Sequence, residues 1–127
     1  MRVVDFMSRR VHTLSPSQSL LEAAQLLSKQ DISGAPVIGA DGRTLGYLSR
    51  TDLVDALAEH GDISALRVEE AMSHEIISIP PEATVEEALK TMVYEGVHRV
   101  VVRVGEGEPL GILSGLDAFR ALTQPRS

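Results

Sequence analysis

Two stretches of the chain place a glycine, a serine and an aspartate at the same spacing. They are Gly46-Tyr47-Leu48-Ser49-Arg50-Thr51-Asp52 and Gly111-Ile112-Leu113-Ser114-Gly115-Leu116-Asp117. In each, a strand is predicted to end at the serine and a helix to begin just after it. The hydroxyl and the free backbone N–H groups at a helix N-terminus suit an anion such as phosphate. The carboxylate only accepts hydrogen bonds, so it suits a pair of sugar hydroxyls. The spacing therefore indicates a clamp for a ribose phosphate.

The same residues also fit a purely structural interpretation. A serine at the end of a strand, followed three residues later by an aspartate, is typical of a helix N-cap. The glycine leaves room for close approach, either of a flat ligand or of another backbone segment. Because the pattern occurs twice at identical spacing, the cap and the ligand clamp stand as alternatives that both remain open.

The repetition extends over nearly the whole chain. Residues 2–57, shifted by about 65 positions, fall on residues 67–122 without a gap, and Met7-Ser8 falls on Met72-Ser73. Such self-similarity means one supersecondary unit used twice. A unit of about 60 residues or fewer is marginal by itself, so we expect the two copies to share one core in a single compact domain. The expected boundaries are 1–60 for the first repeat, 61–65 for a linker, 66–124 for the second repeat and 125–127 for a tail.

Each repeat is predicted to run strand, helix, strand, strand, helix, which is the pattern of a mixed α/β (α+β) fold. One helix is predicted after Ser19 and its copy after Thr84, because a glutamate follows each three residues later, as in a capping box. The second of these helices is predicted to end at Gly96. The remaining predicted elements are the strands Val11–Leu14, Ala35–Ile38, Leu45–Leu48, Val100–Val104 and Leu110–Leu113, and final helices that bury Leu53, Ala56, Leu57, Ala118, Ala121 and Leu122.

Several short segments together resemble a tandem pair of CBS domains (the cystathionine-β-synthase type repeat, or Bateman module). The resemblance implies two β-α-β-β-α units packed around a pseudo-twofold axis. It also implies an adenosyl ligand such as AMP, ADP, ATP or S-adenosylmethionine in the cleft between the repeats, and a homodimer shaped as a flat disc. The segments that carry it are Asp5-Phe6-Met7-Ser8, Gly34-Ala35-Pro36-Val37 and Gly46 to Asp52 in the first repeat, and Glu70-Ala71-Met72-Ser73, His98-Arg99-Val100-Val101-Val102 and Gly111 to Asp117 in the second.

The resemblance also implies roles for individual residues. Asp52 and Asp117 would hold the ribose hydroxyls, and Ser49 and Ser114 would contact phosphate. The extended segments would flank the adenine through Thr13, Leu14 and Pro16 and through Ser78, Ile79 and Pro81. The backbone of Gly34, Ala35 and Pro36, and of Arg99, Val100 and Val101, would read the purine edge.

The two implied sites differ in charge. Arg50-Thr51, where Arg50 is a candidate phosphate partner, becomes Gly115-Leu116 in the second repeat. The pair His98-Arg99 occurs only in the second repeat, where it is the candidate to meet phosphate charge. Because Arg50 has no counterpart in the second repeat, the second site is expected to bind its ligand more weakly or to prefer a less charged ligand.

Composition excludes several function classes. The formal net charge of −6 and the absence of tryptophan argue against a nucleic-acid binder, which neutralises phosphates with Lys and Arg and stacks bases on aromatic rings. Without cysteine there is neither a disulfide nor a thiolate metal site, and the four histidines lack paired ligand spacing, so no metal is expected. No apolar run is long enough to span a membrane and no signal-peptide pattern occurs at the N-terminus. We therefore expect no membrane association and, by default, a cytoplasmic protein.

These observations favour a stand-alone regulatory module that senses an adenosyl ligand, requires no cofactor and acts on a protein partner that the sequence does not identify. The alternative is a ligand-free module that dimerises through the amphipathic helices led by Leu20 and Val85. An enzyme is disfavoured, because no acid, base and nucleophile are brought together by the motifs.

Overall fold

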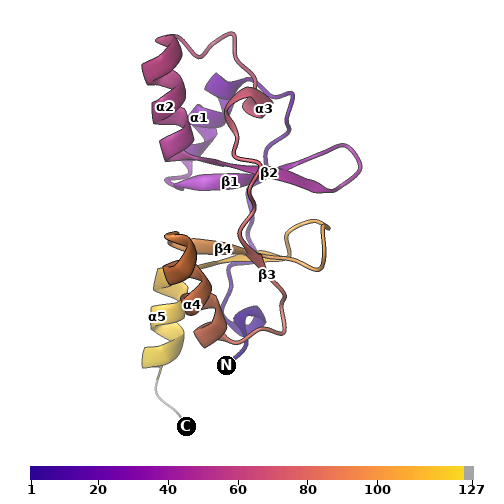
Figure 1. The fold of residues 1–127 in the computed structure, drawn as a ribbon, viewed down its shortest axis with the longest axis vertical. Helices are drawn as coiled ribbons and strands as arrows, with labels where there is room; N and C mark the ends of the chain where they lie inside the picture. The colour runs from indigo at the N-terminus through magenta and orange to yellow at the C-terminus, as the bar shows by residue number, and fades with distance from the viewer. Residues whose placement is uncertain (125–127) are drawn as a thin grey trace. The chain divides into compact units, whose positions relative to one another are not determined.

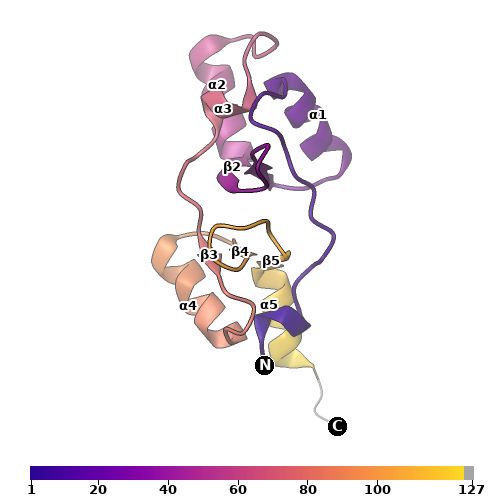
Figure 2. The same ribbon diagram turned by 90° about the vertical axis from the view of Figure 1, so that its right-hand side faces the viewer.

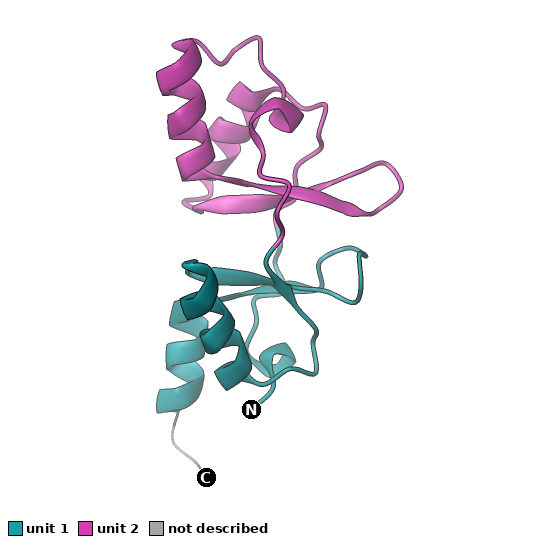
Figure 3. Cartoon of the chain, in the orientation of Figure 1, with its two compact units in different colours: residues 1–11, 77–127 teal, residues 12–76 magenta. Residues whose placement is uncertain are grey.

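The computed structural model describes residues 1–124 of the chain (Figure 1). The tail predicted at 125–127 lies outside the described residues. The chain divides into two compact units (Figure 3): unit 2 is residues 12–76, and unit 1 combines residues 1–11 with the chain from residue 77 onward. This division does not follow the sequence repeat. Each unit holds most of one repeat together with the leading segment of the other.

Unit 2 is a two-stranded antiparallel sheet with helices on one of its faces. The strands are β1 (Gly34–Ile38) and β2 (Thr44–Ser49), and Leu14 adds a single parallel bridge to Val37. Figures 1 and 2 show α1 and α2 on the same side of this ribbon. The helices are α1 (Leu20–Lys29), α2 (Arg50–His60) and the short α3 (Val68–Ala71).

Unit 1 is built in the same way around a three-stranded sheet. The strand order is β3-β4-β5, with β3 parallel to β4 and β5 antiparallel to it. Helices α4 and α5 lie on one face of this sheet (Figures 1 and 2). The elements are the 3₁₀ turn η1 (Val3–Asp5), β3 (Ser78–Ile79), α4 (Val85–Glu95), β4 (Arg99–Val102), β5 (Gly111–Ser114) and α5 (Gly115–Thr123).

The helix starts predicted from the sequence are confirmed. Ser19 Oγ accepts a hydrogen bond from the backbone N–H of Glu22 at 3.4 Å, and Thr84 Oγ1 accepts one from Glu87 at 3.1 Å. These side chains satisfy N–H groups that have no partner inside the helix. Gly96 ends α4 in the left-handed conformation, as predicted. The mixed helix-and-strand class of the fold is likewise confirmed.

Two predicted strands are shorter than expected. In Val11–Leu14 only Leu14 pairs with another strand, so this segment is extended but is not a strand. Strand β4 ends at Val102 instead of Val104. Val104 is 67% exposed, and Gly105, with φ of 57°, turns the chain immediately afterwards. Val104 is thus apolar although it neither pairs with a neighbouring strand nor lies in the core.

The expectation of one shared core is wrong, because the buried apolar side chains form two clusters, one in each unit. Each cluster includes residues from the leading segment of the other repeat. Val3 and Met7 belong to the cluster of unit 1, and Val68 belongs to the cluster of unit 2. A short repeat therefore completes its core with a borrowed segment, which adds buried apolar surface that the repeat alone lacks.

The final helices bury fewer residues than predicted. Leu53, Ala56, Ala118 and Ala121 are buried, but Leu57 is 45% exposed and Leu122 is 48% exposed. Within residues 1–124, no helix combines the length and the apolar composition needed to cross a membrane.

Gly96 offers a test of the repeat at the level of backbone conformation. Its φ is 68°, and a Cβ built there would contact nothing within 4 Å. The Gly96→Ala variant is therefore expected to lower the free energy of unfolding by about 1–2 kcal/mol through backbone strain alone. Asp31 stands at the matching position of the first repeat with φ of 52°. Denaturant unfolding should show a higher free energy of unfolding for Asp31→Gly. A loss of stability in both variants would contradict the interpretation that residues 31 and 96 share a left-handed conformation that favours glycine.

Candidate functional site

Ser49 and Asp52 form a reciprocal cap at the start of α2. The backbone N–H of Ser49 donates to Asp52 Oδ2 at 2.8 Å, and the backbone N–H of Asp52 donates to Ser49 Oγ at 3.1 Å. Both side chains are partly buried. The two bonds fix the carboxylate relative to the end of β2.

The second repeat reproduces this arrangement at the start of α5. The N–H of Ser114 donates to Asp117 Oδ2 at 3.0 Å, and the N–H of Asp117 donates to Ser114 Oγ at 3.1 Å. The helix-cap interpretation is therefore confirmed in both repeats. It does not exclude the ligand clamp, because Oδ1 of each aspartate accepts no hydrogen bond within the described residues and each serine keeps its own O–H donor.

The predicted supply of free backbone N–H groups is smaller than expected. Besides the two N–H groups used in each cap, the N–H of Arg50 donates to the carbonyl of Ser33, and that of Gly115 donates to His98, each at 2.9 Å. These bonds tie the first helical residue to the segment just before the neighbouring strand. A phosphate at these termini would therefore find few main-chain donors and would depend on side chains.

The helix-free face of each sheet, meaning the face opposite the packed helices, carries several of the predicted site residues. In unit 2, Ala35 and Leu48 belong to the core, so their neighbours Gly34, Pro36 and Ser49 lie on the helix-free face. Ala35 can therefore contribute only its backbone to that face.

Unit 1 shows the same division of residues. Val100, Val102 and Leu113 belong to the core, which places the alternating residues on the helix-free face. Arg99 pairs with Ser114, and Ser78 pairs with Val101, so these four residues share that face. Val100, predicted to read the purine edge, can do so only through its backbone.

The extended segments place side chains on both sides of the sheets. Leu14 and Ile79, both less than 10% exposed, belong to the two cores. Thr13 is exposed, whereas Pro16 and Pro81 are half-buried. Any contact of Leu14 or Ile79 with a ligand would therefore be made by the backbone.

Arg50 lies beside Asp31 at 3.3 Å, and both side chains are largely exposed. The two residues line a hollow of about 320 Å³ between α1 and α2, together with Ala24, Leu27, Ser28, Leu53 and Val54. Thr51 and its counterpart Leu116 are exposed, as is His98. The charge of Arg50 is thus balanced on the helix side of unit 2.

Gly46 and Gly111 occupy matching positions of the two repeats, and their presence has a structural explanation. A Cβ on Gly46 would lie 2.5 Å from the carbonyl oxygen of Ser73, and one on Gly111 would lie 2.5 Å from Met7 Sδ and 2.7 Å from the carbonyl oxygen of Ser8. The close approach predicted at these glycines is therefore that of a backbone segment. In both cases this segment leads the opposite repeat: residues 72–73 approach Gly46, and residues 7–8 approach Gly111.

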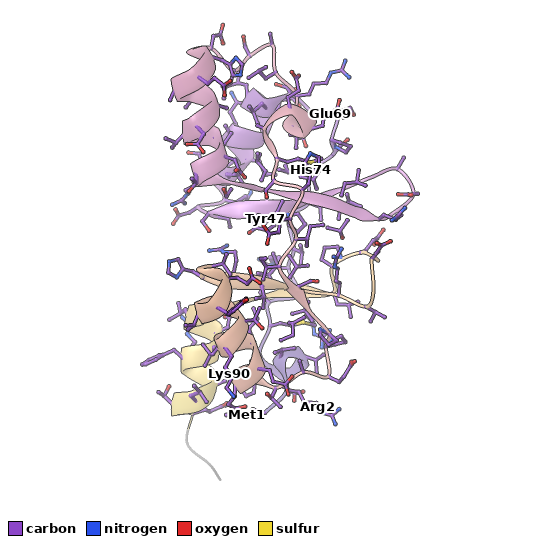
Figure 4. The ribbon with its side chains drawn as sticks, viewed as in Figure 1. Met1, Arg2, Tyr47, Glu69, His74 and Lys90 are labelled. Atoms are coloured by element: carbon purple, nitrogen blue, oxygen red, sulfur yellow. The ribbon has the colours of Figure 1, made fainter. Side chains whose placement is uncertain are left out.

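Two residues on the helix-free faces were not predicted as site residues. Tyr47 lies on the helix-free face of β2 (Figure 4), and its ring packs so closely on Gly34 that a Cβ there would lie 2.5 Å from Tyr47 Cε1. Arg103 follows β4, and its Nε and Nη1 atoms are buried. The sequence contains both the large tyrosine ring and the glycine that makes room for it. It does not give the register of β1 and β2 that brings these two residues together.

Comparison with known proteins settles the family. The CBS domain family model matches residues 3–59 and 68–124. The chain belongs to the CBS domain family. Its two matched segments make it a CBS pair, and the residues between them run from the last residue of α2 to the residue before α3.

Curated relatives of this CBS pair include a protein of similar size and much longer ones. The CBS domain-containing protein YhcV of Bacillus subtilis is 30% identical over 88% of this chain and 79% of its own length. Inosine-5′-monophosphate dehydrogenases of Korarchaeum cryptofilum and Halobacterium salinarum are both 33% identical. The chain spans only 25% and 20% of the lengths of these two dehydrogenases.

Solved structures share the fold over nearly the whole chain. CBSX2 of Arabidopsis thaliana, solved in complex with AMP, is 28% identical with a TM-score of 0.85, covering 97% of this chain and 96% of that one. A CBS-domain containing protein from Agrobacterium tumefaciens is 30% identical with a TM-score of 0.84, covering 95% and 92%.

Proposed function

We propose that this CBS pair is a regulatory module that binds an adenosyl ligand and holds its ribose through Asp52 and Asp117. The observation that carries the proposal is the doubled cap. In each repeat the cap fixes one carboxylate oxygen, Oδ2, and leaves Oδ1 as an oriented acceptor. A carboxylate held in this way is suited to the two neighbouring hydroxyls of a ribose, because it is ordered before the ligand arrives.

The other site residues complete the proposal. Ser49 and Ser114 each keep a hydroxyl proton that can be donated to a phosphate oxygen. The segments at Thr13–Pro16 and Ser78–Pro81 would flank the base, and the backbone of Gly34–Pro36 and Arg99–Val101 would read its edge. The AMP complex of CBSX2 supports the choice of an adenosine ligand, because that protein matches this chain along nearly its full length.

The mode of action proposed is regulation without chemistry of its own. A ligand changes the behaviour of a protein only when it binds two conformations with different affinity. We therefore expect the adenosyl ligand to shift an equilibrium between two arrangements of the CBS pair, which an interacting protein then recognises.

A thermal-shift series tests the proposal. Adenosine, AMP, ADP, ATP, S-adenosylmethionine and 5′-methylthioadenosine are compared at equal concentration and ionic strength. A ligand at about 100 times its Kd should stabilise the protein by about 2.7 kcal/mol. An unchanged midpoint with every compound, at concentrations up to the millimolar range, would reject the adenosyl module.

The exposed apolar surface of unit 1 supports a second candidate, which is self-association. Leu20 and Val85, which motivated the ligand-free alternative, are fully buried. The exposed residues come from the other sides of the helices. On α4, Val93 and Tyr94 are 82% and 88% exposed, and Lys90 lies on the same helix (Figure 4). On α5, Leu116, Phe119 and Leu122 are 58%, 62% and 48% exposed.

A single substitution on α4 tests whether the chain self-associates through this surface. Sedimentation of the wild-type chain is expected to show a dimer, and Tyr94→Glu is expected to shift it toward monomer by placing a charge in the apolar contact. Val104→Glu is the matched control, since it also exchanges an exposed apolar residue of unit 1 for glutamate. A monomeric wild-type chain at high micromolar concentration would contradict the candidate.

A further inference from the structure

The hollow between α1 and α2 lies on the helix side of unit 2, opposite the helix-free face of the sheet. Leu27 and Leu53, which are 2% and 8% exposed, form its apolar floor. Val54 lies at its edge and is 62% exposed. Arg50 and Asp31 form an ion pair of 3.3 Å on its rim, and both side chains are largely exposed. The hollow therefore combines an apolar floor with a charged rim.

The matching surface of unit 1, between α4 and α5, has a different character. Three polar or charged rim residues of unit 2 correspond to valine or glycine in unit 1, namely Ser28 to Val93, Asp31 to Gly96 and Arg50 to Gly115. Val54 corresponds to Phe119, a larger side chain that is 62% exposed. Val93 is 82% exposed. Unit 1 thus presents an exposed aromatic ring in an apolar setting where unit 2 has a hollow with a charged rim.

These two surfaces are complementary in shape and in chemistry. A phenylalanine ring is rigid and has few rotatable bonds, so it enters a hollow at a small cost in conformational entropy. Seated there, Phe119 would cover the apolar floor of Leu27 and Leu53. The guanidinium of Arg50 would stack on the ring, as arginine does on aromatic faces. Asp31, whose side chain is 98% exposed, would keep its contact with water.

Contacts between like surfaces are less favourable. Two copies of unit 2 face to face would leave both hollows without packing atoms, and their ion pairs would lose water without gaining an aromatic partner. Two copies of unit 1 face to face would cover the exposed side chains of α4 and α5 but would leave the hollows of unit 2 open. A contact between unlike units fills the hollow and covers the exposed ring at the same time.

We infer that unit 1 of one copy of the chain docks on unit 2 of a second copy, with Phe119 of the first copy seated in the hollow between α1 and α2 of the second. Two copies related by a twofold rotation make this contact twice, so the pair closes as a dimer. The inference rests on the proposed self-association of the chain, and it adds which surfaces meet.

Cysteine cross-linking of the full chain distinguishes these arrangements, because the natural sequence contains no cysteine. Ser28→Cys places a thiol at the rim of the hollow, and Val93→Cys places one at the matching position on α4; both positions are exposed. A short bifunctional thiol reagent is added to each single variant and to the variant that carries both substitutions. The double variant is expected to give covalent dimers, and each single variant is expected to give several-fold fewer.

The cross-linked products separate the inference from the self-association on which it rests. Covalent dimers from a single variant at the yield of the double variant would show that like units meet, which overturns the inference and keeps self-association. Peptide mass analysis that finds residues 28 and 93 joined within one chain would also overturn it. A wild-type chain that sediments as a monomer at high micromolar concentration would reject self-association together with the inference.

Two substitutions on the opposing surfaces test whether Phe119 itself occupies the hollow. Phe119→Ala removes the ring, and Ala24→Leu narrows the hollow with the side chain that the second repeat has at Leu89. Each is expected to weaken dimerisation by about 10- to 100-fold, as measured by sedimentation. Val104→Ala is the matched control, since it also shortens an exposed apolar side chain of unit 1, and it should dimerise like the wild type.

The variant that combines Phe119→Ala with Ala24→Leu decides whether the two positions act through one contact. Once the ring is absent, narrowing the hollow should cost nothing further, so the double variant should dimerise no more weakly than the weaker single variant. Losses that multiply in the double variant would overturn the contact, as would wild-type dimerisation of Phe119→Ala.

Discussion

AMP is expected to bind about 10- to 100-fold more weakly at each site when Asp52 and Asp117 are both replaced by asparagine. The expectation follows from the loss of a charged acceptor for the ribose hydroxyls, since such a hydrogen bond contributes about 1.5–3 kcal/mol. Asparagine is chosen over alanine because its side-chain oxygen can still accept from the N–H of Ser49 or Ser114, which Oδ2 accepts in the wild type. The cap is thereby kept, while the second acceptor becomes a donor.

Asp55→Asn is the matched control for this experiment. Asp55 is exposed on α2, one turn beyond Asp52, and its replacement changes the net charge by the same amount at a single position. Titration calorimetry should show wild-type affinity for AMP in the control. Full AMP affinity in the Asp52→Asn and Asp117→Asn double variant would show that the carboxylates serve only as caps.

Gly46→Val is expected to lower the free energy of unfolding by about 3 kcal/mol. The added Cβ would lie 2.5 Å from the carbonyl oxygen of Ser73 and 2.9 Å from Met72 Sδ. The Ser73 backbone cannot move aside freely, because Tyr47 and Ser73 exchange two N–H···O bonds, each of 2.9 Å. The leading segment of the second repeat would therefore have to separate from β2 or distort it.

Gly115→Ala provides the control within the same motif. Its Cβ would meet the carbonyl oxygen of His98 at 3.7 Å, an ordinary contact, and it would stand at the start of α5, where alanine is well tolerated. Denaturant unfolding should give wild-type stability or slightly more for Gly115→Ala. A stability loss in Gly46→Val no larger than that of the control would contradict the account of segment exchange.

Local features of the fold could be predicted because they depend on neighbouring residues. The caps at Ser49 and Ser114 and the left-handed Gly96 each follow from a short pattern with a direct physical cause. The end of β4 could not be predicted in the same way, since Val104 continues the apolar run yet is exposed. Apolar runs predict burial only where a partner surface covers them.

Features that join distant segments were beyond the sequence pattern. Met7 belongs to the core of unit 1 and Met72 packs against the core of unit 2, but nothing in their spacing shows that each packs against the glycine of the opposite repeat. The same holds for Arg103, whose Nε and Nη1 atoms are buried although the residue follows a strand that could have ended in solvent. Contacts of this kind depend on the tertiary arrangement of the chain.

A crystal structure of the chain grown with AMP tests the central claim most directly. The account predicts adenosine with its ribose hydroxyls within hydrogen-bond distance, about 2.5–3.0 Å, of Oδ1 of Asp52 or Asp117, while Oδ2 keeps its bond to the serine N–H. Adenosine bound elsewhere, with both carboxylates in contact only with their caps, would contradict it.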